Sequence, residues 1–179
     1  MPEGMVQDPM EKYANVFVDA CKELLDSWER GEVLMRSEAD LRCHLFSECL
    51  RLMKERNFER PYEISVEQNM KGKRPDLTLG WRATETDEGE RWAVVVEIKW
   101  VETTDKVTKS GVEEDMLKLG EYFESCMGVF CYLLLIDGTK RYKDALKQER
   151  FSLVCEGAIR PFDRRIDALL YGYNPLERE

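Results

Sequence analysis

Two N-terminal segments carry hydrophobic residues at the spacing of an amphipathic helix. In residues 10–30 the apolar positions recur every three or four residues, and Gly31 follows as the expected helix end. The same spacing over residues 38–57 predicts a second helix. Ser37 is a natural N-cap for it, and Asp40 can direct its carboxylate back toward the helix start. The chain is therefore expected to open with two helices that each bury one face.

Three strands are expected next. Residues 62–70 alternate between apolar and polar side chains, which is typical of a half-buried strand. Residues 74–84 and 91–101 predict two more strands, and the polar segment 85–90 between them predicts a turn. The last two strands should therefore form an antiparallel hairpin.

A helix and a central strand are predicted after the hairpin. The segment Ser110-Gly111-Val112-Glu113 has the S-x-x-E form of a capping box, which predicts a helix over 112–127. The continuous apolar run 129–136 is typical of a strand that is covered on both faces. Because a helix connects this strand to strand 91–101, the two strands should be parallel.

The length of 179 residues and the hydrophobic fraction of 43% favour a single α/β domain. Its core is expected over residues 37–136, as a central mixed sheet flanked by helices, with the N-terminal helix as an addition. Residues 140–179 form a second addition, with a helix near 140–149 and a strand near 151–155. The remaining residues carry weak signals.

Net charge and targeting signals limit the partners and the cellular location that we expect. The net charge of −9 argues against a general nucleic-acid binder, although segments 71–74 and 140–150 are basic. No apolar run approaches the length of about 20 residues that a membrane helix needs. Residues 1–10 lack the basic start and apolar core of a signal peptide. A cytoplasmic protein without a membrane partner is therefore expected.

The cysteines and the histidine exclude several classes of site. None of the six cysteines forms a C-x-x-C pair, so zinc ribbons lack support and buried, reduced thiols are expected. His44 is the single histidine, which excludes enzymes that need two. We expect His44 to flank a helix. Hydrolytic chemistry in this chain would have to rely on carboxylates and lysine.

An acid, a second acid and a lysine converge on the predicted hairpin. On strand 91–101, Glu97 and Lys99 share one face, and a turn near 86–88 places Asp76 opposite position 97 or 99. One explanation is a structural salt bridge, although buried ion pairs stabilise weakly. The other is a Mg²⁺ site, because this ion prefers carboxylate oxygens and the adjacent lysine can hold a water. The backbone carbonyl of Ile98 is a further candidate ligand.

The segments Arg74-Pro75-Asp76 and Glu97-Ile98-Lys99 resemble the PD-(D/E)xK nuclease superfamily, whose members have the restriction-endonuclease-like fold. The resemblance implies an αβββαβ core and phosphodiester hydrolysis that depends on Mg²⁺ or Mn²⁺. It also implies that Asp76 and Glu97 bind the metal and that Lys99 is catalytic. Many members add a glutamate from the preceding helix, and Glu38 and Glu48 both lie on the inward face of helix 38–57. Of the two we favour Glu38, because a carboxylate at the start of a helix interacts well with the helix dipole.

Other charged and aromatic residues are ambiguous. Lys73, Arg74, Lys106 and Lys109 are candidates for contacts with nucleic-acid phosphates, or simply solvated charges. On the polar side of helix 112–127, Asp115 and Lys118 are expected to form a solvated pair. The strand tryptophans are expected in the core, on the face away from Asp76 and Glu97; they are Trp81, Trp92 and Trp100.

The first expectation for function is a metal-dependent nuclease that acts on DNA. The acidic balance speaks against sequence-specific restriction and favours a different class, a catalytically inactive binding or assembly module with the same fold. An RNA nuclease is a third possibility, which the sequence does not separate from the first. A homodimer is left open.

Overall fold

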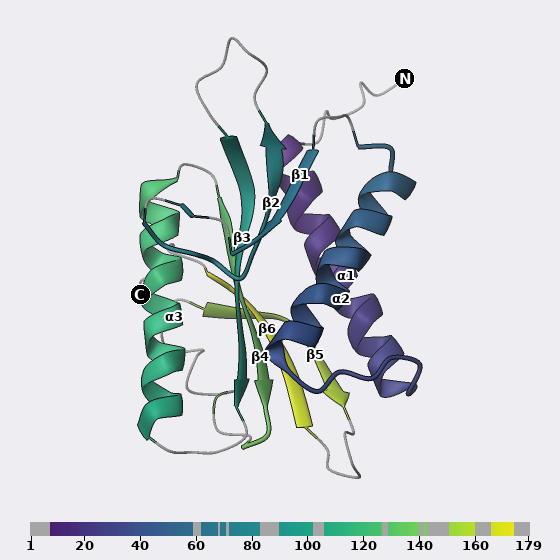
Figure 1. Ribbon diagram of the computed structural model, residues 1–179, viewed down its shortest axis with the longest axis vertical. Helices are drawn as coiled ribbons and strands as arrows, with labels where there is room; N and C mark the ends of the chain where they lie inside the picture. Colours follow the sequence, from purple (N-terminus) through teal and green to yellow (C-terminus); the bar gives the residue numbers. More distant parts are fainter. Residues whose placement is uncertain are drawn as a thin grey trace.

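A six-stranded mixed sheet with helices on both faces is the framework of the protein in the computed structural model (Figure 1). The structure describes residues 8–58, 62–67, 69–70, 72–82, 90–101, 106–126, 129–139, 142, 151–159 and 166–173. In chain order its elements are α1 (Pro9–Glu29), α2 (Glu38–Glu55), β1 (Tyr62–Val66), β2 (Leu77–Arg82), β3 (Glu90–Val101), α3 (Lys106–Ser125), β4 (Phe130–Asp137), β5 (Phe151–Ile159) and β6 (Ile166–Tyr173).

The first two helices lie where the sequence predicts them, and α2 has a defined start. The hydroxyl of Ser37 accepts a hydrogen bond from the N–H of Asp40 at 3.1 Å. The carboxylate of Asp40 in turn accepts from the N–H of Arg36 at 2.9 Å. These two bonds satisfy N–H groups that have no partner inside the helix. Because Glu38 is the first residue of α2, the cap also fixes where Glu38 lies.

The strands pair in the order β1-β2-β3-β4-β6-β5. Strands β3 and β4 are parallel, as predicted, and every other pair in this sheet is antiparallel. Seven of the eight residues of β4 are buried, which confirms the expectation for the apolar run 129–136. Strand β1 ends at Val66 and is therefore shorter than the predicted strand 62–70. Met70 lies outside it, in an isolated bridge with Lys73.

A β-bulge interrupts the alternation along β3. Gly80 pairs with Trp92, and the register shifts beside this pair, so that Ala93 is an extra residue. As a result Trp92 packs on the α3 side of the sheet. Trp81 and Trp100 pack on the opposite side, as expected. The prediction for the face of Trp92 is therefore wrong, since a bulge reverses the side on which the preceding residues lie.

Helix α3 begins at Lys106, six residues before the predicted start. Ser110 is therefore inside the helix, where its hydroxyl bonds the carboxylate of Glu114 at 3.2 Å, and the predicted capping box is wrong. A four-residue motif is weak evidence when packing against a sheet can extend a helix through it. Lys106 and Lys109 belong to this first part of the helix rather than to a loop, and their side chains lie outside the described residues.

The C-terminal segment contributes two strands. β5 is longer than predicted, and β6, which the sequence did not indicate, lies between β4 and β5. The apolar stretch of β6 is short and Gly172 follows it, so the strand signal is weak. The helix expected near 140–149 lies outside the described residues, apart from Tyr142.

Two hydrophobic cores hold the layers together. Helices α1 and α2 cover one face of the sheet and α3 covers the other (Figure 1). The buried residues of the described chain include three carboxylates, Glu97, Asp115 and Asp137. Asp137 is satisfied by bonds from Thr139 and from the N–H of Tyr142 in the turn after β4. The other two carboxylates face each other between β3 and α3, where a buried charge needs a specific partner.

Candidate active site on the hairpin

Strand β3 continues beyond the point where β2 begins, which leaves two of its backbone amides without a strand partner. The pairing ends at Leu77 of β2. Beyond it, the N–H of Ile98 donates to Oδ2 of Asp76 at 2.8 Å. The N–H of Trp100 donates to Oε1 of Glu38, also at 2.8 Å. Two carboxylates from different elements therefore take the place of the missing strand.

The hairpin brings Asp76 and Glu97 together, as the sequence predicts. Extending the register by one residue from Leu77 and Val96 places Asp76 opposite Glu97. Only 2% of Glu97 is exposed. Burial raises the pKa of Glu97 to about 8, and the charges of Asp76 and Asp115 act in the same direction. One proton is therefore held readily by this pair of carboxylates.

The pKa of Asp76 is also raised, as the net result of influences that oppose one another. Burial is the main cause of the rise, and the charges of Asp115 and Glu38 add to it. The amide of Ile98 and the guanidinium of Arg42 favour the ionised form. Asp76 therefore has two direct partners for its charge, at 2.8 and 3.0 Å, whereas the cation beside Glu97, Lys118, is 3.8 Å away.

One oxygen of Glu97 has no hydrogen-bond partner. Its Oε1 is buried and unpaired, and so is the hydroxyl of Tyr122 on α3. The charge of Glu97 is the largest influence after burial on the raised pKa of Tyr122. Buried polar atoms are rarely left unpaired, so an orphaned carboxylate oxygen at this point indicates a missing partner.

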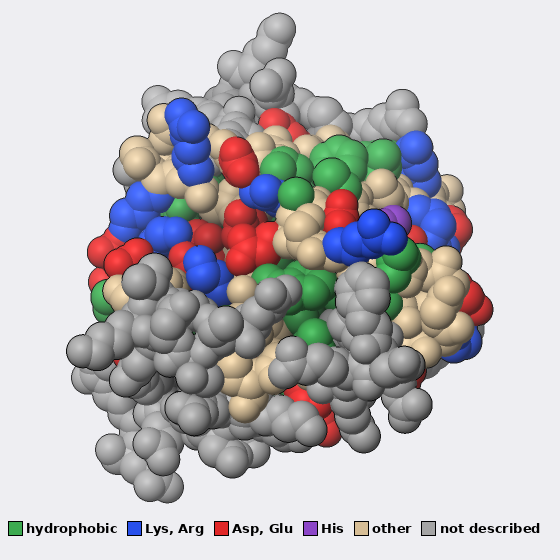
Figure 2. All heavy atoms as spheres, turned by 60° about the horizontal axis from the view of Figure 1, so that its bottom comes forward, with side chains coloured by type: hydrophobic (Ala, Val, Ile, Leu, Met, Phe, Trp, Pro, Cys, Tyr) green, Lys and Arg blue, Asp and Glu red, His purple; other side chains and the backbone are tan. Residues whose placement is uncertain are grey.

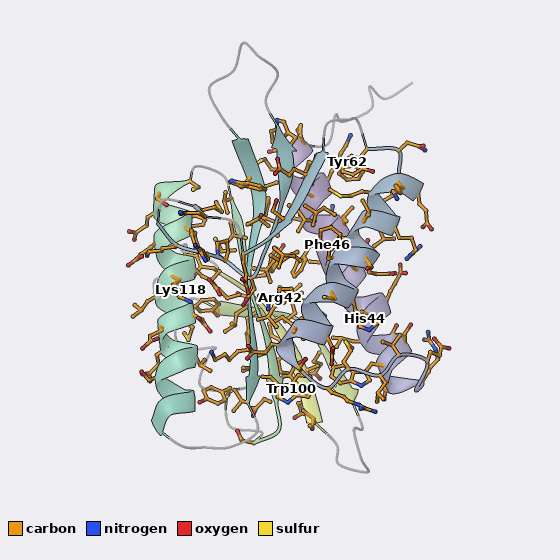
Figure 3. The ribbon with its side chains drawn as sticks, in the orientation of Figure 1. Arg42, His44, Phe46, Tyr62, Trp100 and Lys118 are labelled. Carbon is orange, nitrogen blue, oxygen red and sulfur yellow. The ribbon has the colours of Figure 1, made fainter. Side chains whose placement is uncertain are left out.

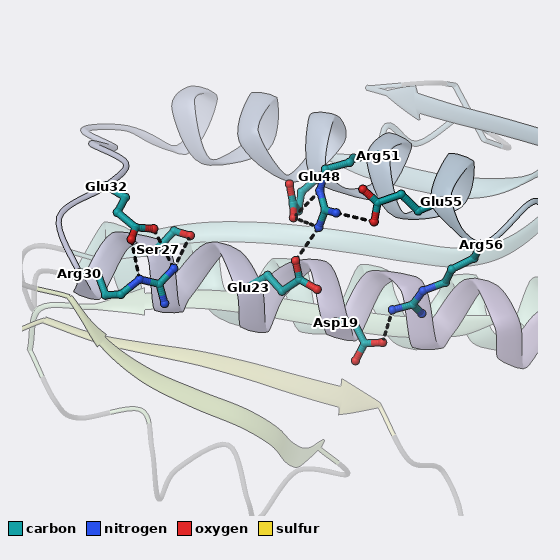
Figure 4. A network of polar contacts seen from close by, with 9 residues as sticks. All are labelled: Asp19, Glu23, Ser27, Arg30, Glu32, Glu48, Arg51, Glu55 and Arg56. Atoms are coloured by element: carbon teal, nitrogen blue, oxygen red, sulfur yellow. Dashed lines mark hydrogen bonds and ion pairs between the residues drawn. The ribbon is translucent and has the colours of Figure 1, made fainter.

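Of the two candidate helix glutamates, the structure brings Glu38 to the hairpin. Glu38 lies at the start of α2, bonded to Trp100, and its charge influences Asp76. Glu48 lies instead in a network between α1 and α2, where its Oε1 accepts a hydrogen bond from Arg51 at 2.5 Å (Figure 4). Arg51 lowers the pKa of Glu48, so this carboxylate is ionised and already paired.

Helix α3 adds a carboxylate, Asp115, that was expected in solvent but is buried. Asp115 is 6% exposed and lies between two lysines. Its Oδ1 is 2.8 Å from Nζ of Lys118, and its Oδ2 is 3.5 Å from Nζ of Lys99. Lys118 also lies 3.8 Å from Oε2 of Glu97. The pair expected on a solvated face is therefore part of the site.

The signal for Asp115 is present in the sequence. The buried residues of α3 include Val112, Met116, Leu119 and Tyr122, and Asp115 falls on the same helical face. A single carboxylate in such a stripe indicates either a rim position or a partner on the sheet. The expectation of a solvated pair with Lys118 on the polar side of the helix concealed this position.

Arg42 is a second residue of the site that sequence reasoning missed. It lies one turn after Glu38 on α2, and its Nη1 is 3.0 Å from Oδ1 of Asp76. The same nitrogen is 2.5 Å from Oε1 of Glu67, which follows β1. Figure 3 shows Arg42 between α2 and the sheet, with Lys118 on α3 at the other side of the sheet. Because residues four apart lie on one face of a helix, the position of Arg42 relative to Glu38 was the signal in the sequence that it could reach the same site.

The structure describes the side chains of two of the four candidate phosphate-binding residues, Lys73 and Arg74. Lys73 forms an ion pair with Glu121 of α3. Arg74, two residues before Asp76, is exposed. The side chains of Lys106 and Lys109 lie outside the described residues. Figure 2 shows acidic side chains gathered on one face of the molecule with lysine and arginine side chains beside them.

His44 and the six cysteines complete the set of candidate nucleophiles and metal ligands in the chain. His44 lines an open cleft between α1 and α2, together with Glu23 and Glu48. All six cysteines are free thiols, as expected, but only three of them are buried, since Cys126 and Cys155 are half-buried and Cys43 is exposed. Neither the histidine nor a thiol is among the groups that shift the pKa of Asp76 or Glu97.

Comparisons with known proteins give no match, so function has to be inferred from the chemistry of this site. No model of a known protein family matches the chain, and no characterised protein is significantly similar to it. In the described part of the chain, no three His, Cys, Asp or Glu side chains are grouped as a ready metal site. None of the described helices combines the length and the apolar composition needed to cross a bilayer.

Proposed function

We propose that the protein is a Mg²⁺- or Mn²⁺-dependent nuclease with a restriction-endonuclease-like fold, which hydrolyses phosphodiester bonds in DNA. The observation that carries the proposal is the buried carboxylate of Glu97, which faces Asp76 and keeps one oxygen unpaired. Lys99 lies two residues further along the same strand face. The order of elements from α2 to β4 is αβββαβ, the order that the resemblance of the motif implies.

The donor atoms suit a hard divalent cation. Asp76 and Glu97 supply carboxylate oxygens, and Glu38 lies close enough to influence the charge of Asp76. A strand residue directs its N–H and its C=O toward the same neighbour, so the carbonyl of Ile98 points to the side of Asp76. A cation here would neutralise the carboxylates and give the orphaned oxygen of Glu97 its partner.

The balance of charges favours an anionic substrate. The cluster contains four carboxylates, Glu38, Asp76, Glu97 and Asp115. It contains three cations, Arg42, Lys99 and Lys118. With every group ionised the sum is 3 − 4 = −1, and a divalent cation would change it to +1. A phosphodiester brings the negative charge that such a site would attract.

In this proposal each residue has a defined task. A bound cation supplies Lewis acidity and lowers the pKa of a ligand water. Asp76 and Glu97 would hold the cation, for which Glu97 has to be ionised. The ammonium of Lys99 has only donors, so it holds the attacking water or a phosphate oxygen. Asp115 keeps that ammonium on the side of α3.

Cleavage assays with a matched pair of variants test the proposal. Wild-type protein should cleave at least one of a panel of duplex, single-stranded and branched DNA and RNA with Mg²⁺ or Mn²⁺, and should not do so with EDTA. Glu97→Gln should abolish cleavage. Glu48→Gln is the control, because Glu48 lies outside the site, and it should cleave like the wild type. Cleavage by Glu97→Gln at the wild-type rate would refute the proposal.

A second function, the inactive binding module, has one observation in its favour. Arg42, Lys99 and Lys118 already pair with the acids of the cluster, so the protein neutralises much of the negative charge itself. In that case the cluster would be a structural ion-pair network. Calorimetry with Mg²⁺ and Mn²⁺ separates the nuclease from the inactive module, because a structural network would bind neither ion. The DNA and RNA substrates of the panel would then also stay uncleaved.

A further inference from the structure

Arg42 approaches Asp76 from α2 and is bonded to one of its two carboxylate oxygens. Its guanidinium lies against Oδ1 of Asp76, while Oδ2 is taken by the amide of Ile98. The arginine side chain is only 18% exposed, so it is held between α2 and the hairpin. Both oxygens of Asp76 are therefore engaged before any metal binds.

A guanidinium and a divalent cation compete for the same carboxylate. Each favours the ionised form of Asp76, and the charge of Arg42 already does so. Two cations on one carboxylate repel each other strongly in a partly buried site, where water screens little of the interaction. Metal binding at Asp76 must therefore weaken the bond from Arg42.

A second acid is placed to keep Arg42 nearby when Asp76 releases it. Glu67 accepts a hydrogen bond from the same nitrogen of Arg42, and Glu67 is largely exposed. Its backbone has a φ of 51°, a left-handed conformation that is unfavourable for glutamate. The bond to Arg42 is an interaction that can hold the residue in this conformation.

We propose that Arg42 is an exchangeable cation, which pairs with Asp76 in the absence of metal and binds a phosphate of the nucleic acid once metal has bound. The inference rests on the metal site of the proposed function. Guanidinium groups match the planar geometry of phosphate oxygens and remain charged at every relevant pH. One side chain thus stabilises the empty site and then helps to recognise the substrate, which links metal binding to substrate binding.

Metal titration of Arg42→Gln tests the first half of the exchange. Without nucleic acid, calorimetry should show Mn²⁺ binding about tenfold more tightly than in the wild type, the size of effect that one nearby charge has on a carboxylate. Arg42→Lys, which keeps the charge, should remain near the wild type. Arg56→Gln is the matched control, because Arg56 caps the C-terminal end of the same helix and pairs with Asp19 of α1 at 2.7 Å.

Binding of labelled nucleic acid tests the second half. With Ca²⁺ present, Arg42→Gln should bind short fluorescein-labelled DNA and RNA duplexes more weakly than the wild type. The slope of log Kd against log salt should fall by about one, as expected for the loss of one phosphate contact. Loss of a purely structural contact would weaken the binding of both Mn²⁺ and the duplexes. The exchange instead predicts tighter binding of Mn²⁺ and weaker binding of nucleic acid.

The outcomes separate this inference from the proposed function. Mn²⁺ binding by the wild type with unchanged or weaker binding by Arg42→Gln overturns the exchange and leaves the nuclease proposal intact. Tighter Mn²⁺ binding and weaker duplex binding without any cleavage supports the exchange and overturns the nuclease. If neither protein binds Mn²⁺, both ideas are wrong. Thermal unfolding of each variant confirms that it is folded before the titrations are compared.

Discussion

The carboxylate of Glu38 accepts a hydrogen bond of 2.8 Å from the backbone amide of Trp100, although 62 residues separate the two in the chain. The bond ties the first residue of α2 to β3 just beyond the reach of β2. The indole of Trp100 in turn contacts Trp28 of α1, with ring centroids 5.5 Å apart. Both helices of this layer therefore fix the position of the strand that carries Glu97 and Lys99.

The first prediction separates the lysine from the metal ligands. Lys99→Ala should bind Mn²⁺ nearly as well as the wild type but cleave about 10²–10³ times more slowly, because it removes one electrostatic stabiliser of the transition state. Glu97→Ala should lose both metal binding and cleavage. Calorimetry and single-turnover kinetics on the same preparations measure the two effects. Wild-type cleavage by Lys99→Ala would make the lysine structural.

The second prediction concerns Gly111, which lies within α3 opposite Lys99. A Cβ at this position would lie 3.1 Å from Cε and 3.2 Å from Nζ of Lys99. Alanine should favour the helix by about 1 kcal/mol relative to glycine. The flexible lysine can move aside, so Gly111→Ala should keep or raise the melting temperature while cleavage becomes slower.

Gly120 provides the control within the same helix. A Cβ there would make only an ordinary contact, 3.5 Å from the hydroxyl of Tyr173. Gly120→Ala should gain a similar stability and leave the cleavage rate unchanged. Equal rates for the two alanine variants would show that the position of the Lys99 ammonium is unimportant for the reaction.

The third prediction is the pH dependence of stability without metal. The pKa of Glu97 is raised from 4.5 to about 8, so the folded state holds this proton more tightly than the unfolded state. The stabilisation is complete below about pH 4.5 and is lost as the pH rises through 8. Glu97→Gln, which resembles the protonated form, should lose less stability over this interval. Parallel pH profiles in thermal or denaturant unfolding would contradict the raised pKa.

The fourth prediction assigns Asp115 a positioning role. Asp115→Asn removes a like charge that raises the pKa of Glu97, so the pH at which Mn²⁺ binding begins should fall. It also removes a partner of Lys99, and cleavage should slow about tenfold, as for other residues that orient groups of a metal site. Glu124→Gln, at an exposed position on the same helix, is the control. An unchanged pH profile would leave Asp115 without this role.

The hairpin part of the site could be predicted because its geometry is local. Asp76, Glu97 and Lys99 follow from strand alternation and a short turn. The preference for Glu38 over Glu48 rested on the helix dipole alone, since both lie on one helical face. The contact of the helix start with β3 is what distinguishes them in the structure.

The residues that were missed depend on contacts between elements. Asp115 and Arg42 reach the site from opposite layers, and their partners lie on strands far away in the sequence. The face of Trp92 depends on a bulge, which no regular alternation contains. The strand β6 has too short an apolar stretch to be recognised before its neighbours are known.

The position of β6 has a consequence for synthesis of the chain on the ribosome. β6 is the last described strand, yet it is inserted between β4 and β5. All residues of the candidate site precede Ile166, so they emerge before this strand does. Until β6 emerges, β4 keeps an open edge and β5 has no neighbour in the sheet. A chain interrupted before Ile166 would therefore lose two strands of the sheet, and such nascent chains should be prone to edge-to-edge association.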